Sequence, residues 1–227
     1  MSELEVLHCD NHLLGVVKPA GLPVVPDASG DESLLDRARL WIAEEFDKPG
    51  RVFCGVVHRL DRPVSGVVLF ARTSKAADRL GRQFRERSVR KLYWGLVEGG
   101  VGEDSGEVVQ HLWKDTERNR VHASSAAREG TREARTSWRR LGADGRSTWL
   151  ELVPHTGRSH QLRLACARGL GTPLLGDLKY GAGAALEDRS IALHARRLEV
   201  AHPTRGESIV LEAGVPNLAA WGLVGSG

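Results

Sequence analysis

The sequence predicts an α+β domain in which a mixed, largely antiparallel sheet is flanked by helices and loops. Short runs rich in Val, Leu and Ile, which are typical of strands, alternate with only two stretches of helical spacing. The 227 residues, of which 41% are hydrophobic, suffice for a substantial core. No Pro-rich linker, low-complexity tract or fixed-period repeat interrupts the chain. We therefore expect a single domain over residues 1–227.

The predicted strands end at turn residues. The first strand, over residues 12–17, stops before Pro19 and Gly21, which favour a turn. Further apolar runs predict strands over residues 67–71, 91–97, 148–153, 191–200 and 208–211. Residues 99–145 are polar and sparsely apolar, so we expect hairpins and exposed loops there rather than a second core.

Two helices are predicted from apolar residues at helical spacing. Ser33 can cap the first helix, and Ser74 can cap the second. The apolar stripe of the first consists of Leu34, Leu35, Ala38, Trp41, Ile42 and Phe46. In the second helix Ala77, Leu80 and Phe84 are apolar, and several arginines occupy the other faces.

The charge pattern is compatible with an RNA partner without requiring one. The net charge is only +3, but six of the 32 basic residues are Lys and the rest are Arg. The rigid fork of arginine suits bidentate phosphate contacts and stacking on bases. A GC-rich genome explains the same bias equally well, since its codons favour Arg, Gly and Ala.

Several features indicate a cytoplasmic protein. The longest apolar runs are far shorter than the roughly 18 to 20 residues of a membrane-spanning helix. The N-terminus is mixed and acidic, unlike a signal peptide. Cys9, Cys54 and Cys166 lack the paired spacings of a zinc site or a disulfide framework.

Residues 57–66 form the first cluster of candidate functional residues. Asp61 lies between Arg59 and Arg62 in a turn that precedes a predicted buried strand. Loops held at the end of a rigid sheet commonly carry function, and flanking positive charges keep a carboxyl ionised. Alternatively, Asp61 stabilises the turn and forms surface salt bridges.

Two further clusters lie in the second half of the chain. Within residues 155–163, Gly157 permits close backbone approach, while Arg158, Gln161 and Arg163 supply directional donors. Alternatively, this segment is a helix start capped by Thr156 or Ser159. Residues 176–181 are a polar turn between two glycines, which alone indicates only a loop.

In their order and spacing these segments resemble the motifs of the RluA-type pseudouridine synthase family. The matching parts are residues 58–66, Tyr93 after Lys91, residues 155–163 and residues 176–181, supported by residues 18–24, 193–195 and 202–203. The resemblance covers residues 11–211. Two positions differ: Val64 stands where the family usually has Thr, and Ala165 where it usually has His. No small N-terminal RNA-binding domain, which many relatives carry, is expected before Asn11.

The resemblance implies an enzyme that isomerises uridine to pseudouridine in ribosomal or transfer RNA. The reaction breaks the glycosidic C–N bond and rejoins the base through carbon, so it needs neither a cofactor nor a metal. The resemblance also implies a flipped-out uridine. We expect a monomer whose polar region, residues 99–145, selects the RNA.

The resemblance also assigns roles to individual residues. Asp61 is the catalytic carboxylate, acting as nucleophile or base, and Arg163 is its ion-pair partner. Tyr93 stacks on the flipped uracil and takes the carbon-bound proton. The other implied substrate-binding or RNA-binding residues are Leu162 as an apolar wall, Arg59 as the group that fills the gap, Arg62, Arg158 and Gln161.

Other interpretations remain open from the sequence. Considered alone, Tyr93 is more typical of a core strand, and Leu162 fits the core as well as the pocket. An RNA chaperone that kept the fold but lost turnover is the alternative function, suggested only by Val64 and Ala165. A metal site of His58, His155, His160 and His194 has no supporting spacing, and we expect His58 and His160 to be hydrogen-bonded structural groups.

Overall fold

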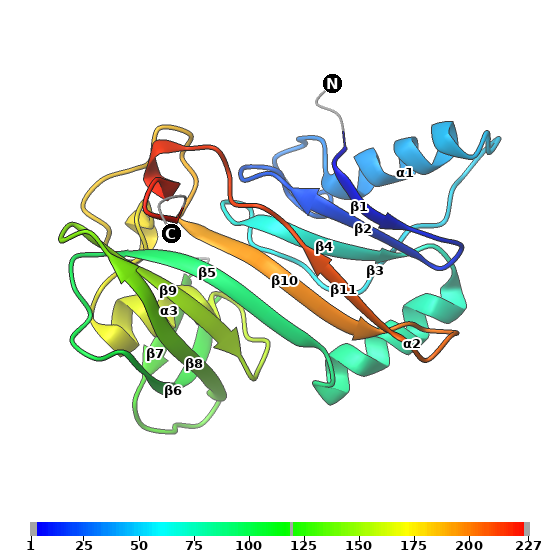
Figure 1. Ribbon diagram of the computed structural model, residues 1–227. Helices are drawn as coiled ribbons and strands as arrows, with labels where there is room; N and C mark the ends of the chain where they lie inside the picture. Colours follow the sequence, from blue (N-terminus) through cyan, green and yellow to red (C-terminus); the bar gives the residue numbers. More distant parts are fainter. Residues whose placement is uncertain (1–3, 119, 225–227) are drawn as a thin grey trace. The chain divides into compact units, whose positions relative to one another are not determined.

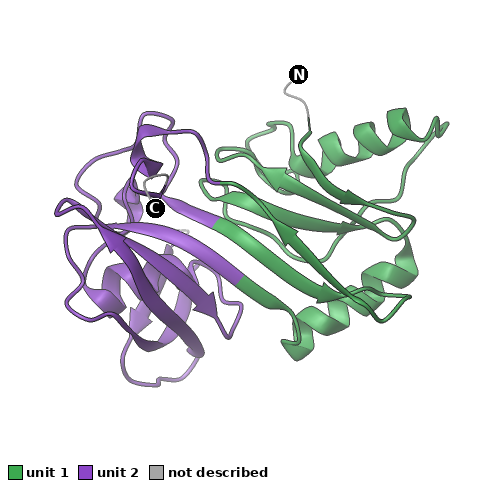
Figure 2. Ribbon diagram, in the orientation of Figure 1, with its two compact units in different colours: residues 1–91, 195–214 green, residues 92–194, 215–227 purple. Residues whose placement is uncertain are grey.

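The computed structural model describes residues 4–118 and 120–224 (Figure 1). It divides into two compact units (Figure 2). The first comprises residues 1–91 and 195–214, and the second comprises residues 92–194 and 215–227. The predicted α+β class is confirmed in both units, since strands predominate and helices are few.

The first unit is built on strands that follow one another in the order β1, β2, β4 and β10, with β3 beside β4 and β11 beside β10. Their bounds are Val6–Cys9, Leu13–Lys18, Ser65–Ala71, Leu193–Ala201, Gly55–Val56 and Ser208–Glu212, respectively. The pairs β1–β2, β2–β4, β3–β4 and β10–β11 are antiparallel. All residues of β4 are buried, as its continuous apolar run predicts.

Two helices belong to the first unit. Helix α1, Leu34–Glu45, begins at Ser33, whose side chain accepts from the Asp36 amide in a capping box, so this predicted cap is confirmed. Helix α2, Ser74–Glu86, is capped by Thr73 rather than by Ser74. Thr73 has extended backbone angles and its hydroxyl accepts from the Ala76 amide at 3.2 Å, whereas Ser74 is already helical. Apolar side chains of β2, β4, β10 and β11 pack against Ala76 and Leu80 of α2.

The described residues of the second unit form five strands in the order β5, β9, β8, β6 and β7. Their bounds are Arg90–Glu98, Ser147–Pro154, Arg132–Ala143, Ser105–Asp115 and Arg120–Ser124, and each neighbouring pair is antiparallel. Its helical segments are α3 (Gln161–Leu164), the π-helical η1 (Ala165–Leu170), and the 3₁₀ turns η2 (Leu178–Tyr180) and η3 (Ala219–Trp221).

Residues 99–145 form long hairpin strands, and the expectation that they lack a core is wrong. Leu112, Val121 and Ala134 of these strands are buried in a cluster with Leu164 and Tyr180. Because alternate residues of a strand face the same side, a sparse set of apolar residues is enough to cover one face of a sheet. The low apolar content of this region is therefore compatible with a second packed face, which the sequence analysis did not predict.

Membrane insertion through a helix has no support in the described ranges. None of the helices there combines the length and the apolar character that a membrane span requires.

Candidate active-site residues

Asp61 lies in a tight turn that leads directly into β4. Its carbonyl accepts from the Val64 amide at 3.0 Å, and the Val64 side chain is buried. The turn enters β4 through Gly66, which has φ +115°. A Cβ at Gly66 would lie 2.4 Å from the carbonyl oxygen of Ala195, so only glycine fits. A backbone hydrogen bond and a glycine thus shape the turn, and Val64 contributes a buried apolar side chain to it.

Lys18 anchors this turn from the end of β2. Its side chain is fully buried, and Nζ donates to the carbonyl oxygens of Pro19 (2.9 Å), Leu22 (2.8 Å) and Arg62 (3.0 Å). The backbone amide of Gly21 also donates to the Arg62 carbonyl, at 2.8 Å. Burial lowers the pKa of Lys18 to about 7, and the nearby charge of Asp61 opposes this shift.

Sequence reasoning noted Lys18 only as part of a motif and missed this anchoring role. The available signal was a lysine that closes an otherwise apolar strand, Leu13–Lys18. Such a side chain must either reach solvent or find buried acceptors. The acceptors here are main-chain carbonyls, which no residue pattern reveals.

We expect Lys18→Met to lower the free energy of unfolding by about 3 kcal/mol, because the carbonyls that Nζ binds would lose a charged donor. Methionine keeps an unbranched side chain of similar length, so packing changes little. Urea unfolding measures the effect, with Lys75→Met on the exposed face of α2 as the matched control. A loss at Lys18 no larger than at Lys75 would contradict the anchoring role.

The neighbouring basic residues differ in their surroundings. Arg59 is exposed. The Arg62 guanidinium donates to the Gly21 carbonyl (2.9 Å) and to Ser29 Oγ (3.0 Å), and it forms an ion pair with Asp31. Arg62 therefore binds the loop that follows β2. Its side chain is also 41% exposed, so part of it is accessible at the surface.

His58 has a structural role, as expected. Its Nε2 accepts from the Leu69 amide at 2.9 Å, and its ring stacks on Phe84 with centroids 4.8 Å apart. Burial lowers the pKa of His58 to about 3, with a further contribution from the charge of Lys91. The backbone bond and the stacked ring make His58 a hydrogen-bonded structural group.

In the second unit, Arg163 of α3 is held by Asp177. Arg163 Nε donates to Asp177 Oδ2 at 2.8 Å, and Nη2 donates to Oδ1 at 2.6 Å. Both side chains are buried, and the guanidinium carbon lies 4.9 Å from the centre of the Tyr180 ring. A bidentate carboxylate and an aromatic ring fix the plane of the guanidinium. Sequence reasoning counted residues 176–181 among the segments that match the family motifs but gave Asp177 no role.

Gln161 holds the preceding loop against β8. Its Oε1 accepts from Thr156 Oγ1 (2.7 Å) and from the Arg158 amide (3.0 Å). Its Nε2 donates to the Arg135 carbonyl (2.9 Å) and to Thr136 Oγ1 (3.0 Å). Protein groups thus occupy both ends of the amide, so we expect any effect of Gln161 on RNA to act through this loop. Arg158 donates from Nε to the Glu133 carbonyl at 3.1 Å.

The alternative caps proposed for this segment are not used. Helix α3 has His160 at its N-cap position, and no side chain caps it. His160 has φ +54° and its Nδ1 lies 2.6 Å from the hydroxyl of Tyr180. The expected structural role of His160 is therefore confirmed.

Leu162 is buried, whereas Tyr93 on β5, opposite Leu152 of β9, remains partly exposed.

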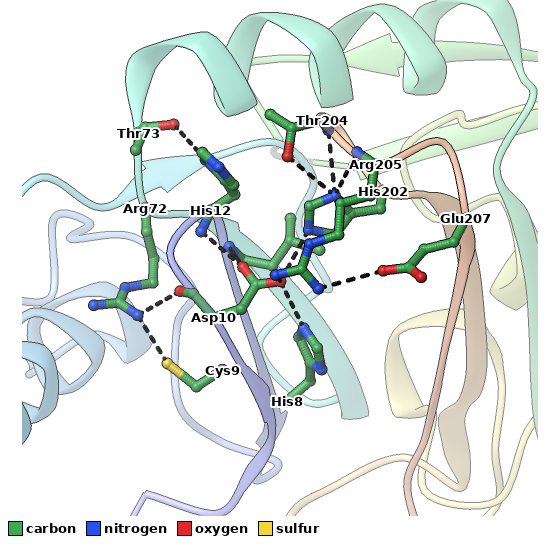
Figure 3. A network of polar contacts seen from close by, with 11 residues as sticks. His8, Cys9, Asp10, His12, Arg72, Thr73, His202, Thr204, Arg205 and Glu207 are labelled. Atoms are coloured by element: carbon green, nitrogen blue, oxygen red, sulfur yellow. Dashed lines mark hydrogen bonds and ion pairs between the residues drawn. The ribbon is translucent and has the colours of Figure 1, made fainter.

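A polar network around Asp10 ties the β1–β2 turn to the segment between β10 and β11 (Figure 3). Asp10 Oδ1 accepts from the amides of His12 (2.7 Å) and Leu13 (2.8 Å), and Oδ2 lies 2.9 Å from His202 Nε2 and 3.2 Å from His8 Nε2. His202 Nδ1 accepts from the Thr204 and Arg205 amides, so Nε2 is the donor to Asp10. No group of three or more His, Cys, Asp or Glu side chains in the described part of the chain is arranged to hold a metal ion.

Asp10 is expected to stabilise the first unit in a pH-dependent way. Burial raises the pKa of Asp10, but the hydrogen bonds from His12, Leu13, His202 and His8 outweigh it and lower that pKa well below its usual range. A depressed carboxyl pKa stabilises the fold above the unfolded value near 4 and loses that contribution as the pH falls further. We expect Asp10→Asn to cost about 2 kcal/mol at pH 7 and much less near pH 2.

Urea unfolding of both proteins across this pH range measures the difference. The exposed Asp78→Asn is the control, for which we expect little change at any pH. An Asp10→Asn loss that is the same at pH 7 and pH 2 would show that the carboxylate charge is not the stabilising element.

Residues 12–168 match the family model described as RNA pseudouridylate synthase. The chain is 39% identical over 215 residues to the dual-specificity RNA pseudouridine synthase RluA of Haemophilus influenzae, with 92% of each chain covered. It is 35% identical over 235 residues to tRNA pseudouridine synthase C of Salmonella typhimurium, covering 93% of this chain and 85% of that one. An uncharacterized RNA pseudouridine synthase of Synechocystis is 34% identical, and this chain spans 66% of its length.

Solved structures give a concordant fold. Human RNA Pseudouridylate Synthase Domain Containing 1 superposes with a TM-score of 0.73 at 28% identity, covering 95% of this chain and 85% of that one. Human RNA Pseudouridylate Synthase Domain Containing 4 has a TM-score of 0.78 at 24% identity, covering 94% of this chain and 89% of that one. At that identity the similarity supports the fold alone.

Proposed function

The chain belongs to the RNA pseudouridylate synthase family, and we propose that it isomerises specific uridines to pseudouridine in ribosomal or transfer RNA. The observation that carries this proposal is Asp61 in an anchored turn, inside the motif that resembles the family's catalytic segment. The names of the relatives support the choice of RNA, because they include a dual-specificity enzyme and a transfer-RNA enzyme.

Asp61 is proposed to be the catalytic carboxylate. It acts at the sugar–base junction, as nucleophile or as base, when the glycosidic bond breaks. The turn supports this role because a backbone bond, Gly66 and the buried Lys18 hold its main chain in place. A carboxylate that is held before the substrate arrives need not be ordered during the reaction.

The remaining roles follow the family motif. Arg163 is proposed to be the ion-pair partner that orients Asp61, and its bidentate bond to Asp177 supports this by fixing the guanidinium plane. Tyr93 stacks on the flipped uracil and takes the proton from carbon, consistent with its partial exposure. Leu162 supplies an apolar wall, and the exposed Arg59 replaces the flipped nucleotide in the RNA stack.

Arg62, Arg158 and the loop held by Gln161 are proposed to contact the RNA. The exposed arginines of α2 add positive charge for phosphate contacts, which makes affinity fall as salt rises. We further propose that residues 1–227 act as one catalytic domain and that the protein is a cytoplasmic monomer that requires neither cofactor nor metal.

Pseudouridine mapping tests the proposed function. Ribosomal and transfer RNA from cells that lack the gene is incubated with the purified chain and sequenced after pseudouridine-specific chemistry. We expect new pseudouridines at discrete positions that are also present in RNA from cells that carry the gene. RNA that binds the chain but gains no pseudouridine would contradict the proposal and favour an RNA chaperone.

A further inference from the structure

The second unit carries a groove lined by none of the proposed catalytic residues. It has a volume of about 490 Å³, within the usual range for ligand sites. Strands β6 and β7 contribute one part of its lining, and α3, η1 and η2 contribute the other. The lining residues are Trp113, Arg120, Val121, His122, Ala123, Leu164, Arg168 and Tyr180.

Two of the lining residues, Trp113 and His122, form an aromatic pair. Trp113 of β6 and His122 of β7 are opposite each other in the antiparallel ladder. Their rings stack at 5.3 Å between centroids with an interplanar angle of 19°, and both residues are partly exposed. Stacked, partly exposed aromatic rings are what single-stranded nucleic acids use as a platform for their bases.

Two arginines, Arg120 and Arg168, carry the positive charge of the lining. Arg120 Nη2 donates to the Lys179 carbonyl at 2.6 Å, and its guanidinium carbon lies 5.6 Å from the centre of the Tyr180 ring. Arg168 of η1 is exposed. Among the described residues that line the groove there is no carboxylate. The planar guanidinium groups of these two arginines suit a phosphate group.

We propose that this groove binds an unpaired nucleotide of the RNA substrate other than the target uridine. The base stacks on Trp113 and His122, and its phosphate contacts Arg120 and Arg168. The inference rests on the proposed function and deepens it by giving the chain a second point of RNA recognition. Binding an unpaired base by stacking selects for a flexible or looped RNA rather than for a continuous duplex.

Tyr180 couples the groove to the proposed catalytic machinery within the second unit. Its ring lines the groove and also lies against the guanidinium of Arg163, with 4.9 Å between the Arg163 guanidinium carbon and the ring centre. Its hydroxyl bonds to the Val121 carbonyl at 3.2 Å in the β7 wall. A nucleotide bound in the groove therefore lies against the same Tyr180 ring that packs on Arg163.

RNA binding by groove variants tests the inference. Fluorescence anisotropy with a short, fluorescein-labelled oligouridylate compares Trp113→Ala and Arg168→Glu with the wild-type chain. We expect each variant to bind at least about fivefold more weakly, and Trp113→Phe to retain most of the affinity because a ring remains.

With 4-thiouridine in the same RNA, we expect ultraviolet cross-links in the peptides that contain Trp113 and His122.

The controls separate this result from misfolding and from the proposed function. Arg146→Glu reverses an exposed charge in the β8–β9 turn outside the groove, and its affinity should stay near wild type. Arg168 is also exposed, so its variant should unfold in urea like the wild type. Wild-type affinity in both Trp113→Ala and Arg168→Glu would overturn the inference even if pseudouridine forms. Weakened binding in these variants without any pseudouridine from the wild-type chain would contradict the proposed function alone.

Discussion

Asp61→Asn is expected to lower the rate of pseudouridine formation by at least about 10³-fold, without a comparable loss of stability or RNA binding. Asparagine has nearly the same shape but has no negative charge to act as nucleophile or base. The bond that closes the turn joins the Asp61 carbonyl to the Val64 amide and survives the substitution. Single-turnover conversion of unmodified RNA, followed by mass spectrometry of nucleosides, measures the rate.

Asp31→Asn provides the matched control for this result. Asp31 is an exposed carboxylate that pairs with Arg62, the residue next to Asp61. Its loss changes the local charge by the same amount, yet we expect less than a tenfold change in rate, because exposed ion pairs contribute little. An Asp61→Asn protein that stays within tenfold of the wild-type rate would remove Asp61 from the chemistry.

The elements that sequence reasoning placed correctly depend on local patterns. The Ser33 cap and the buried β4 run need only neighbouring residues to be identified. The Thr73 cap was misplaced by one residue because Thr73 and Ser74 are both good caps, and only backbone angles distinguish them. The second packed face near Val121 was missed because its partners, Leu164 and Tyr180, lie some 40 to 60 residues further along the chain.

In the candidate site, too, some features could be identified from local sequence and others depend on residues that only the fold brings together. Motif order was enough to select Asp61 and Arg163 as candidates, since both lie in long and specific segments. It could not reveal that Lys18 binds main-chain carbonyls, because any residue can supply those acceptors. Nor could it pair Arg163 with Asp177, because the chain separates them by a helical segment and a turn whose path only the fold defines.

Asp177→Ala is expected to lower the free energy of unfolding by about 3 to 5 kcal/mol, because it removes the carboxylate bound to Nε and Nη2 of the buried Arg163. Asp177→Asn should cost less, since its amide oxygen still accepts one of these two bonds. Urea unfolding measures both variants, and the exposed Asp188→Asn is the control. A cost below about 1 kcal/mol for Asp177→Ala would show that the pair does not stabilise the second unit.

Removing both partners separates stability from chemistry. The double variant Arg163→Met with Asp177→Leu replaces the buried pair by apolar groups, and such replacements are often neutral or stabilising. We therefore expect it to unfold at nearly the wild-type urea concentration. If Arg163 is also the ion-pair partner of Asp61, as proposed, the double variant remains slow by at least about 10²-fold despite being folded. A double variant with both wild-type stability and wild-type rate would leave Arg163 a purely structural residue, held by Asp177 for the fold alone.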